Sequence, residues 1–394
     1  MRCDFVHGGD VWRYGHGILD FSANINPLGP PAGVREALLK SLDEVIFYPE
    51  PHARTLRAAL AAAYGVAPQE VIVGNGAAEL IFLYCRARQG LHAVAPVPTF
   101  SEYDLACRAA GGRFHTYPLA EKDAFQISVD DFLDWFHRWR GVAAGSGGIE
   151  GAPTVFLCSP NNPTGQLLSR EVLEALQAGL AATGASLFLD LSFLGFVPGQ
   201  CLANAALPLV PLTDFREIIR QEGDGQEMGA ALPAGLFLLF SFTKLFALPG
   251  IRLGFAIGPR TLIAAMERQR DPWTVNTPAQ RAGCRCLQEQ EYVRQSAELI
   301  TAAREELVRG LERIGGITVF PGTANFLLCH LRQRRVRAAA LAAALAAEGI
   351  LIRNASDFAG LDPYYFRLAV RHPAANAQLL EKLHNFGTNN FGTQ

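Results

Sequence analysis

Between residues 55 and 260, helical patterns alternate with six short apolar runs, and this alternation limits what the chain can fold into more than any other feature. Runs that are apolar at nearly every position are typical of strands that crossover helices bury on both faces. The pattern predicts an α/β fold with a mostly parallel central sheet, in a large domain over residues 45–270. The runs span residues 71–73, 92–95, 154–158, 186–189, 236–240 and 254–257.

The regions on either side of this domain show different patterns. Residues 1–44 carry turn signals and one short helical pattern, Gly33–Leu42, which predicts an N-terminal arm that also forms part of a small domain. Residues 271–394 are predicted to form a smaller C-terminal α+β domain. Its expected helices span 280–313 and 336–348, and its expected strands span 317–320, 325–329, 350–353 and 365–370.

Two Gly-rich polar stretches interrupt the large domain. They cover residues 141–152 and 221–229. Such composition is typical of surface loops that tolerate insertion. We expect both to be loops without a role in function.

Charge and apolar patterning exclude several classes of function. The formal net charge is -2, and the longest basic cluster is the short run 332–337, so we expect no nucleic acid and no membrane as a partner. No apolar segment reaches the roughly 18 residues that a membrane span needs, which favours a cytoplasmic protein. The eight cysteines lack the paired spacing of a zinc site. We predict that they are buried, reduced thiols and that no metal is bound.

Lysine is rare in this chain, and one lysine stands in an unusual setting. The sequence has four lysines against 31 arginines. Lys244 lies just beyond the apolar run 236–240, where a parallel strand would end. Burial at a strand end lowers the pKa of an amine and makes it a nucleophile toward an aldehyde. The alternative is a lysine with a buried stem and a solvated ammonium group, and the neighbouring segments argue against it.

Two segments carry groups that can bind a phosphate. The segment 241–252 around Lys244 offers two hydroxyls and a guanidinium, the donors that a phosphate dianion accepts from. The segment 74–79 follows an apolar run and opens a helical pattern, so its small residues leave backbone N–H groups open to an anion. The residues assigned to this phosphate site are Gly76, Ala77, Ala78, Ser241, Thr243 and Arg252.

Two further predicted strands end in polar side chains. Asp190 ends the run 186–189, at the edge of the sheet where parallel strands present side chains to a cleft. A carboxylate there can pair with a protonated pyridine nitrogen and keep the ring an electron sink. Asn162 follows the run 154–158, and its amide can hydrogen-bond a ring hydroxyl, although the bare pattern also fits a simple turn.

The order and spacing of these segments resemble those of the fold type I enzymes that use pyridoxal 5'-phosphate (PLP), the family of aspartate aminotransferase. The resemblance covers nearly the whole chain and implies that Lys244 forms a Schiff base with PLP and that Asp190 pairs with the pyridine nitrogen. It also implies that Phe100 stacks on the ring and that Tyr48 reaches the cofactor phosphate of the partner subunit in a homodimer. The matching segments are Gly74–Glu79, Asn161–Gly165, Asp190 and Ser241–Arg252.

The two ends of the chain resemble the threonine-phosphate decarboxylases more than their near relatives, the histidinol-phosphate aminotransferases. The matching segments are His7–Gly9, Asp20–Pro30, Ile352–Leu361 and Phe366–Arg371. Arg353 and Arg367 are each expected at the edge of a short strand. Two guanidiniums suit a dianionic phosphate and are more than a single carboxylate needs. His7, Asn24 and Asn162 are expected to complete the substrate site, which would take a small phosphorylated amino acid.

The predicted reaction depends on which bond at Cα is held perpendicular to the conjugated ring, because only the electrons of that bond can enter the π system. If Arg353 and Arg367 hold the substrate phosphate, the carboxylate can turn out of the plane and CO2 leaves. An arginine on the carboxylate would instead favour transamination. We therefore predict decarboxylation of L-threonine O-3-phosphate to (R)-1-amino-2-propanol phosphate for cobalamin biosynthesis, with Lys244 or a water protonating Cα.

One segment departs from the family pattern and leaves the substrate's methyl group open. Related enzymes often carry Asp-Glu-Ala-Tyr or Asp-Glu-Ala-Phe where this chain has Asp-Leu-Ser-Phe at 190–193. Phe193, at the cofactor site, has no phenol to hydrogen-bond the ring oxygen. Because one methyl group is worth only about 1–3 kcal/mol in an apolar pocket, serine-phosphate decarboxylation is an alternative. A histidinol-phosphate-type aminotransferase is another.

A different class of protein also uses this fold. Some regulators borrow it as an effector-sensing module without catalysis. Such regulators need a DNA-binding segment, and residues before 20 carry neither a helix-turn-helix pattern nor a basic region. The sequence therefore favours an enzyme.

Overall fold

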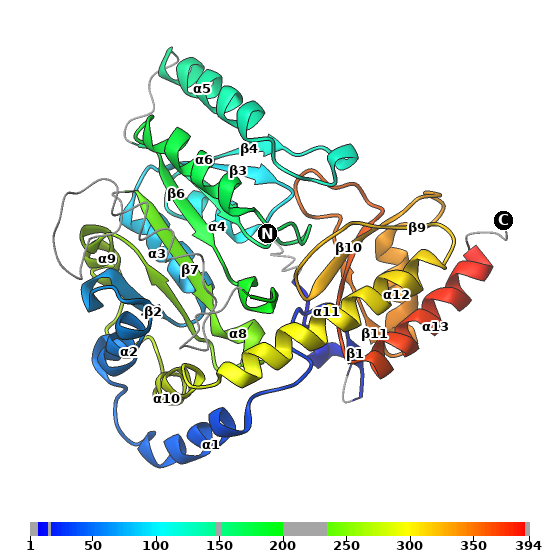
Figure 1. The fold of residues 1–394 in the computed structure, drawn as a ribbon, viewed down its shortest axis with the longest axis horizontal. Helices are drawn as coiled ribbons and strands as arrows, with labels where there is room; N and C mark the ends of the chain where they lie inside the picture. The colour runs from blue at the N-terminus through cyan, green and yellow to red at the C-terminus, as the bar shows by residue number, and fades with distance from the viewer. Residues whose placement is uncertain (1–6, 15–16, 146–151, 200–234, 391–394) are drawn as a thin grey trace.

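A central sheet of seven strands organises the larger part of the protein in the computed structural model, which describes residues 7–14, 17–145, 152–199 and 235–390 (Figure 1). Its strands are β2 (Val71–Gly74), β3 (His92–Val97), β4 (Arg113–Pro118), β5 (Thr154–Cys158), β6 (Ser186–Asp190), β7 (Leu236–Ser241) and β8 (Gly254–Ile257). They are ordered β2-β8-β7-β6-β5-β3-β4. Neighbouring strands from β7 to β4 are parallel, which confirms the predicted fold class.

Strand β8 corrects one detail of that prediction. It runs antiparallel to both of its neighbours, β2 and β7. All four of its residues are buried. Its side chains therefore look the same as those of a parallel strand, because burial on both faces leaves an apolar run that carries no information on strand direction.

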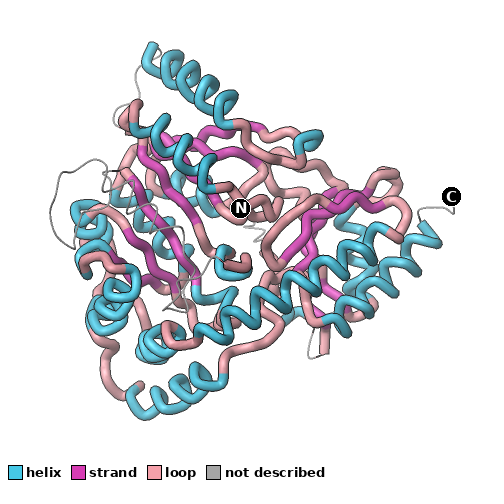
Figure 2. Tube along the Cα trace, viewed as in Figure 1, coloured by secondary structure: helices cyan, strands magenta, loops and turns pink. Residues whose placement is uncertain are grey.

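Helices cover both faces of this sheet because successive residues of each strand point to opposite sides (Figure 2). In β5, Val155 and Leu157 pack into one hydrophobic cluster, whereas Phe156 and Cys158 pack into another. The first cluster includes residues of α2 (Arg54–Tyr64), α5 (Val129–Gly145), α6 (Arg170–Ala181) and α10 (Thr277–Cys286). The second includes residues of α3 (Ala77–Ala87), α4 (Glu102–Ala109) and α9 (Arg260–Glu267).

The C-terminal residues form a second, antiparallel sheet of four strands, ordered β12-β13-β10-β9. Its strands are β9 (Ile317–Val319), β10 (Phe326–Leu331), β12 (Arg353–Asn354) and β13 (Tyr365–Ala369). The helices of this part are α11 (Gln290–Glu312), α12 (Ala338–Ala347) and α13 (Pro373–Asn390). In Figure 1, α11 extends from beside α10 into this second region, so it links the two parts of the molecule.

The N-terminal arm is attached to the C-terminal part by strand pairing. Strand β1 (Leu19–Asp20) pairs in parallel with β11 (Ile350–Leu351), and α1 (Ala32–Ser41) packs on α10. The short helical turns are η1 (Val11–Arg13), η2 (Leu42–Glu44), η3 (Pro51–Ala53), η4 (Pro68–Glu70), η5 (Glu121–Asp123), α8 (Phe242–Leu245) and η6 (Leu194–Phe196). The predicted domain boundaries after residues 44 and 270 stay a prediction.

Several predicted elements have different bounds in the structure. The single helix expected over 280–313 is two helices, because Glu289 leaves the helical region of φ and ψ between α10 and α11. The strand expected over 350–353 is split between two sheets, since β11 pairs with β1 and β12 pairs with β13. The loop expected over 141–152 is wrong for its first residues, which continue α5 to Gly145. The stretch 221–229 lies outside the described residues.

Candidate active site

Lys244 lies in a cavity of about 300 Å³ at the carboxyl edge of the large sheet. It is placed there by α8, a single turn that follows β7 and is capped by Ser241. The lysine Nζ donates to Ser241 Oγ over 3.2 Å. Burial lowers the pKa of Lys244 to about 8, although the carboxylate of Asp190 opposes this shift. Near physiological pH a far larger fraction of this amine is therefore neutral, and able to attack a carbonyl, than of an ordinary lysine, although most of it stays charged.

Asp190 lines the same cavity at the end of β6, and both of its carboxylate oxygens accept hydrogen bonds. The Tyr103 hydroxyl donates to Oδ2 over 2.8 Å, and the Ser192 backbone N–H donates to Oδ1 over 2.9 Å. Burial, together with the nearby Asp190 carboxylate, raises the pKa of Tyr103 well above its usual range, so the phenol keeps its proton. These two donors fix the orientation of the carboxylate toward the cavity.

Tyr103 was missed in the sequence, although a signal was present. It lies three residues after Phe100, and its backbone N–H donates to the Phe100 carbonyl over 3.4 Å in the turn that leads into α4. The two rings meet edge to face, with 5.7 Å between their centroids. A polar aromatic residue one turn beyond a predicted ring-stacking residue is thus a candidate partner for a buried carboxylate.

The turn before α3 has the shape that close approach of an anion requires. Gly76 adopts a φ of +84°, and a Cβ at this position would lie 2.5 Å from Nη2 of Arg252. Ala77 and Ala78 line the Lys244 cavity beside Arg252. The hydroxyls of Ser241 and Thr243 lie 2.8 Å apart at the start of α8. Helix N–H groups, a guanidinium and two hydroxyls form a donor set that fits a phosphate dianion.

A methyl group at position 76 should disturb this site. We expect Gly76→Ala to weaken cofactor binding by at least about tenfold, because the Cβ would both displace the Arg252 guanidinium and adopt a φ that L-residues rarely accept. Titration of the cofactor-free variant with PLP, followed by absorbance, measures the effect. Gly90→Ala, at an exposed turn with φ of +72° and no atom within 4 Å of the added Cβ, is the control for backbone strain alone.

A larger cavity of about 530 Å³ continues from the first. Arg353 and Arg367 line it from neighbouring positions on the paired strands β12 and β13. The structure therefore brings both predicted substrate arginines to the space that adjoins the predicted cofactor lysine. The residues that line both cavities are His7, Phe100, Asn162, Phe193, Lys244 and Arg252.

The two arginines differ in how their charges are compensated. Arg353 forms an ion pair with Asp357 at 2.6 Å. Arg367 donates to Asn162 Oδ1 and to the Ser22 carbonyl, but its Nε has no acceptor and it forms no ion pair with a carboxylate of the described residues. Burial and the adjacent Arg353 lower the pKa of Arg367 to about 9. A buried guanidinium without an anionic partner is a strong binding group for an anion.

The N-terminal arm contributes His7 and Asn24 to this cavity. His7 Nε2 lies 2.9 Å from Oε1 of Glu102, a buried carboxylate that also lines the Lys244 cavity. The side-chain oxygen of Asn24 is buried without a hydrogen-bond partner in the described residues. Three predicted site residues line neither cavity. Gly76 and Ser241 lie directly beside residues that do, whereas Tyr48 is 84% exposed and packs on Trp273.

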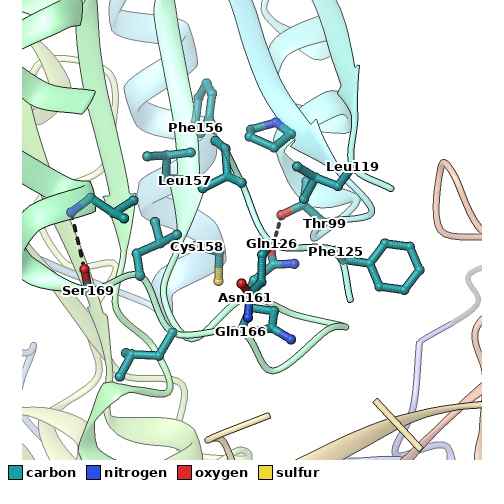
Figure 3. A pocket seen from close by; sticks show the side chains of 15 residues that line it. Thr99, Leu119, Phe125, Gln126, Phe156, Leu157, Cys158, Asn161, Gln166 and Ser169 are labelled. Carbon is teal, nitrogen blue, oxygen red and sulfur yellow. Dashed lines mark hydrogen bonds between the residues drawn. The ribbon is translucent and has the colours of Figure 1, made fainter. Parts of the chain in front are cut away.

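A separate cavity of about 280 Å³ lies between β5, α6 and the segment around Phe125 (Figure 3). Figure 3 shows Thr99 hydrogen-bonded to Asn161 at its wall, a contact of 2.8 Å. Cys158 lines both this cavity and the Lys244 cavity. The lining contains no Asp, Glu, Lys, Arg or His. This cavity therefore lacks the acids, bases and anion-binding groups that gather around Lys244.

Comparison with known proteins decides the family. The model of aminotransferase class I and II matches residues 16–383. The chain belongs to the aminotransferase class I and II family. This confirms the resemblance seen in the sequence, and with it PLP as the cofactor. A Salmonella typhimurium threonine-phosphate decarboxylase is 31% identical over 93% of this chain and 91% of its own.

Another relative and two solved structures are named for one of two activities. A protein of Caldanaerobacter subterraneus, provisionally named a threonine-phosphate decarboxylase, is 34% identical over 96% of this chain and 93% of its own. The structure of a histidinol-phosphate aminotransferase from Clostridium acetobutylicum has a TM-score of 0.78 at 26% identity, covering 94% of this chain and 100% of that one. That of the threonine-phosphate decarboxylase from Porphyromonas gingivalis has 0.75 at 24%, covering 94% and 99%, and shows the fold alone.

No helix in the described part of the chain is long and apolar enough to cross a membrane. The described cysteines are all free thiols, and all but Cys284 are buried. Cys3 and Cys201 lie outside the described residues.

Proposed function

We propose that this protein is a PLP-dependent decarboxylase that converts L-threonine O-3-phosphate to (R)-1-amino-2-propanol phosphate and CO2, for cobalamin biosynthesis. The observation that carries the proposal is Arg367, a buried guanidinium that forms no ion pair with a carboxylate of the described residues, in a cavity continuous with that of Lys244. The activity for which the relatives at 31% and 34% identity are named supports the same reaction.

In this proposal, different residues around Lys244 bind different parts of the cofactor. Gly76, Ala77, Ala78, Ser241, Thr243 and Arg252 hold the cofactor phosphate. Asp190 pairs with the pyridine nitrogen, Asn162 contacts the ring hydroxyl, and Phe100 and Phe193 pack beside the ring. PLP, when bound, supplies an electron sink for the bond that breaks at Cα. The Lys244 amine fixes the cofactor in place and, with its lowered pKa, can exchange a proton near neutral pH.

The substrate arginines provide the geometric preference for CO2 loss. Arg367 and Arg353 bind the substrate phosphate, with Asn24 and His7 on the arm side of the cavity. Because both guanidiniums are then occupied, neither holds the carboxylate in the plane of the ring, and that group can turn into the orientation from which CO2 leaves. Asn162 accepts from Arg367, so the cofactor and substrate sites share one polar side chain.

Two alternatives differ in substrate or in outcome. Serine phosphate lacks one methyl group, and nothing in the cavity separates it from threonine phosphate. A histidinol-phosphate aminotransferase would transfer the amino group of histidinol phosphate to 2-oxoglutarate. Incubation with histidinol phosphate and 2-oxoglutarate tests the second alternative: we expect no glutamate. Rapid glutamate formation there, with no turnover of threonine phosphate or serine phosphate, would overturn the proposed function.

The buried lysine predicts a pH dependence of stability for the cofactor-free protein. Its pKa is lowered from 10.5 to about 8 on folding, so between these values the unfolded chain binds more protons and stability rises with pH. Below pH 8 the amine is charged in both states, and burying this charge costs about 3 kcal/mol. We therefore expect Lys244→Met to gain stability over wild type at pH 7, and this difference to shrink by pH 10. Urea unfolding of both proteins at both pH values measures it, and a difference independent of pH contradicts it.

We also propose that the protein is a homodimer in the cytoplasm. An exposed apolar face on and after α1 supports association, because monomers rarely expose contiguous apolar area of this kind. Its residues are Leu39, Leu42, Val45, Ile46, Phe47, Tyr48 and Trp273. A second copy seated on this face would cover Tyr48, the residue predicted to reach the partner's cofactor phosphate. The free thiols support a reducing compartment.

A further inference from the structure

A buried charge cluster lies behind the turn that precedes α3. Arg270 lies just beyond α9, and its side chain is 3% exposed. Its guanidinium makes two parallel hydrogen bonds to Glu267, from Nε to Oε2 and from Nη2 to Oε1, each 3.0 Å long. Its remaining nitrogen, Nη1, donates to the carbonyl of Val73 in β2. None of these residues lines the Lys244 cavity or the larger cavity, so none of them contacts the cofactor or the substrate in the function proposed above.

Glu79 holds the other end of the same turn. Its Oε2 accepts from the backbone N–H of Asn75 over 2.6 Å and lies 3.9 Å from Nη1 of Arg270. Within the turn itself, the Gly76 N–H donates to the Gly74 carbonyl over 2.8 Å. The backbone is thus fixed at residues 73 and 75, immediately before the glycine that lies against Arg252.

The carboxylate that orients Arg270 is itself held in place. Glu267 lies 2.9 Å from Nδ1 of His52 and 3.4 Å from Nη1 of Arg57. Its side chain is 13% exposed. Buried ion pairs add little net stability because desolvation opposes their attraction, but they restrict the groups they contact to one geometry. Here the restricted group is the backbone of β2 where it enters the turn.

We propose that Arg270 is a positioning residue for the cofactor phosphate. It does not touch the phosphate; it fixes the turn whose small residues and N–H groups do. The inference rests on the phosphate site proposed above. Without the guanidinium, the Val73 carbonyl loses its donor and Glu79 loses its nearest buried cation, so the turn samples other conformations and its donors are no longer preorganised.

Comparison of PLP with pyridoxal, which lacks the phosphate, tests this role without measuring turnover. Dissociation constants of both for the cofactor-free protein are measured by absorbance in wild type, Arg270→Met and Arg57→Met. We expect Arg270→Met to weaken PLP binding by about tenfold or more while pyridoxal changes by less than about twofold. Arg57→Met removes a second cation from Glu267 but none from residues 73–79, and should change neither constant by more than about twofold.

The outcomes distinguish a failure of this inference from a failure of the proposed cofactor-phosphate site. Equal weakening of PLP and pyridoxal by Arg270→Met would mean a general structural role and overturn the inference, as would no change in either. If wild type binds PLP and pyridoxal equally well, the phosphate site itself is wrong. If Arg270→Met does not fold, Arg270→Lys, which keeps one donor and the charge, is compared in the same way, and loss of selectivity for PLP over pyridoxal remains the expected result.

Discussion

Lys244→Ala is expected to abolish the visible absorption band of bound PLP after dialysis and to reduce turnover by more than about 10³-fold. The expectation follows from the position of the amine. It lies half-buried in α8, directly after β7, its pKa is lowered to about 8, and Asp190 lines the same cavity. Alanine removes the nucleophile that anchors the cofactor while leaving the phosphate site intact, so PLP should still bind weakly and wash out.

A second lysine provides the matched control. Lys122→Ala removes an exposed lysine in η5, far in sequence from any residue of the two cavities. We expect its absorption spectrum and turnover to match those of wild type. A visible band that survives dialysis in Lys244→Ala, or is lost in Lys122→Ala, would contradict the assignment of Lys244.

Arg367→Met is expected to reduce kcat/KM for threonine phosphate by about 10²- to 10³-fold, the cost of removing a buried charge that pairs with an anion. The residue makes no ion pair with a carboxylate of the described residues, so the substrate phosphate is its expected counterion. Threonine without the phosphate should be processed at the same low rate by both proteins. The variant should therefore lose most of its selectivity for the phosphorylated substrate.

An exposed arginine and the cofactor spectrum control for indirect effects on Arg367→Met. Arg332→Met, whose guanidinium contacts Thr318 at the surface, should keep full activity. The PLP spectrum of Arg367→Met should also remain that of wild type. Equal losses with threonine and threonine phosphate would show that Arg367 maintains the site instead of binding the phosphate.

The parts of the fold that could be predicted from sequence are those in which burial leaves a clear pattern. The strands β5 and β8 have the predicted bounds. Every residue in each strand is buried, and the apolar run in the sequence ends where the strand ends. Strand β4 was missed because it lies at the sheet edge and none of its residues is buried, so it leaves no apolar run. The antiparallel direction of β8 depends on which strands pair, and side-chain burial does not record it.

In the candidate site, sequence motifs predicted the residues that are proposed to contact the cofactor. Residues that only position other residues had no sequence pattern of their own. Lys244, Asp190 and Arg252 come together in one cavity as expected from strand ends and a glycine turn. Glu102 and Arg270 were missed because their roles depend on tertiary contacts, with His7 across 95 positions and with Val73 across 197. A single sequence does not encode such pairings locally.

Release of labelled CO2 from carboxyl-labelled L-threonine O-3-phosphate by the PLP-loaded protein tests the central proposal most directly. The proposed function predicts one CO2 and one phosphorylated amine for each substrate consumed, without any 2-oxo acid in the reaction. It also predicts far slower release from unphosphorylated threonine, because Arg367 would then lack its anion. Retention of the label in the substrate, together with glutamate formation when histidinol phosphate and 2-oxoglutarate are supplied, would contradict the account.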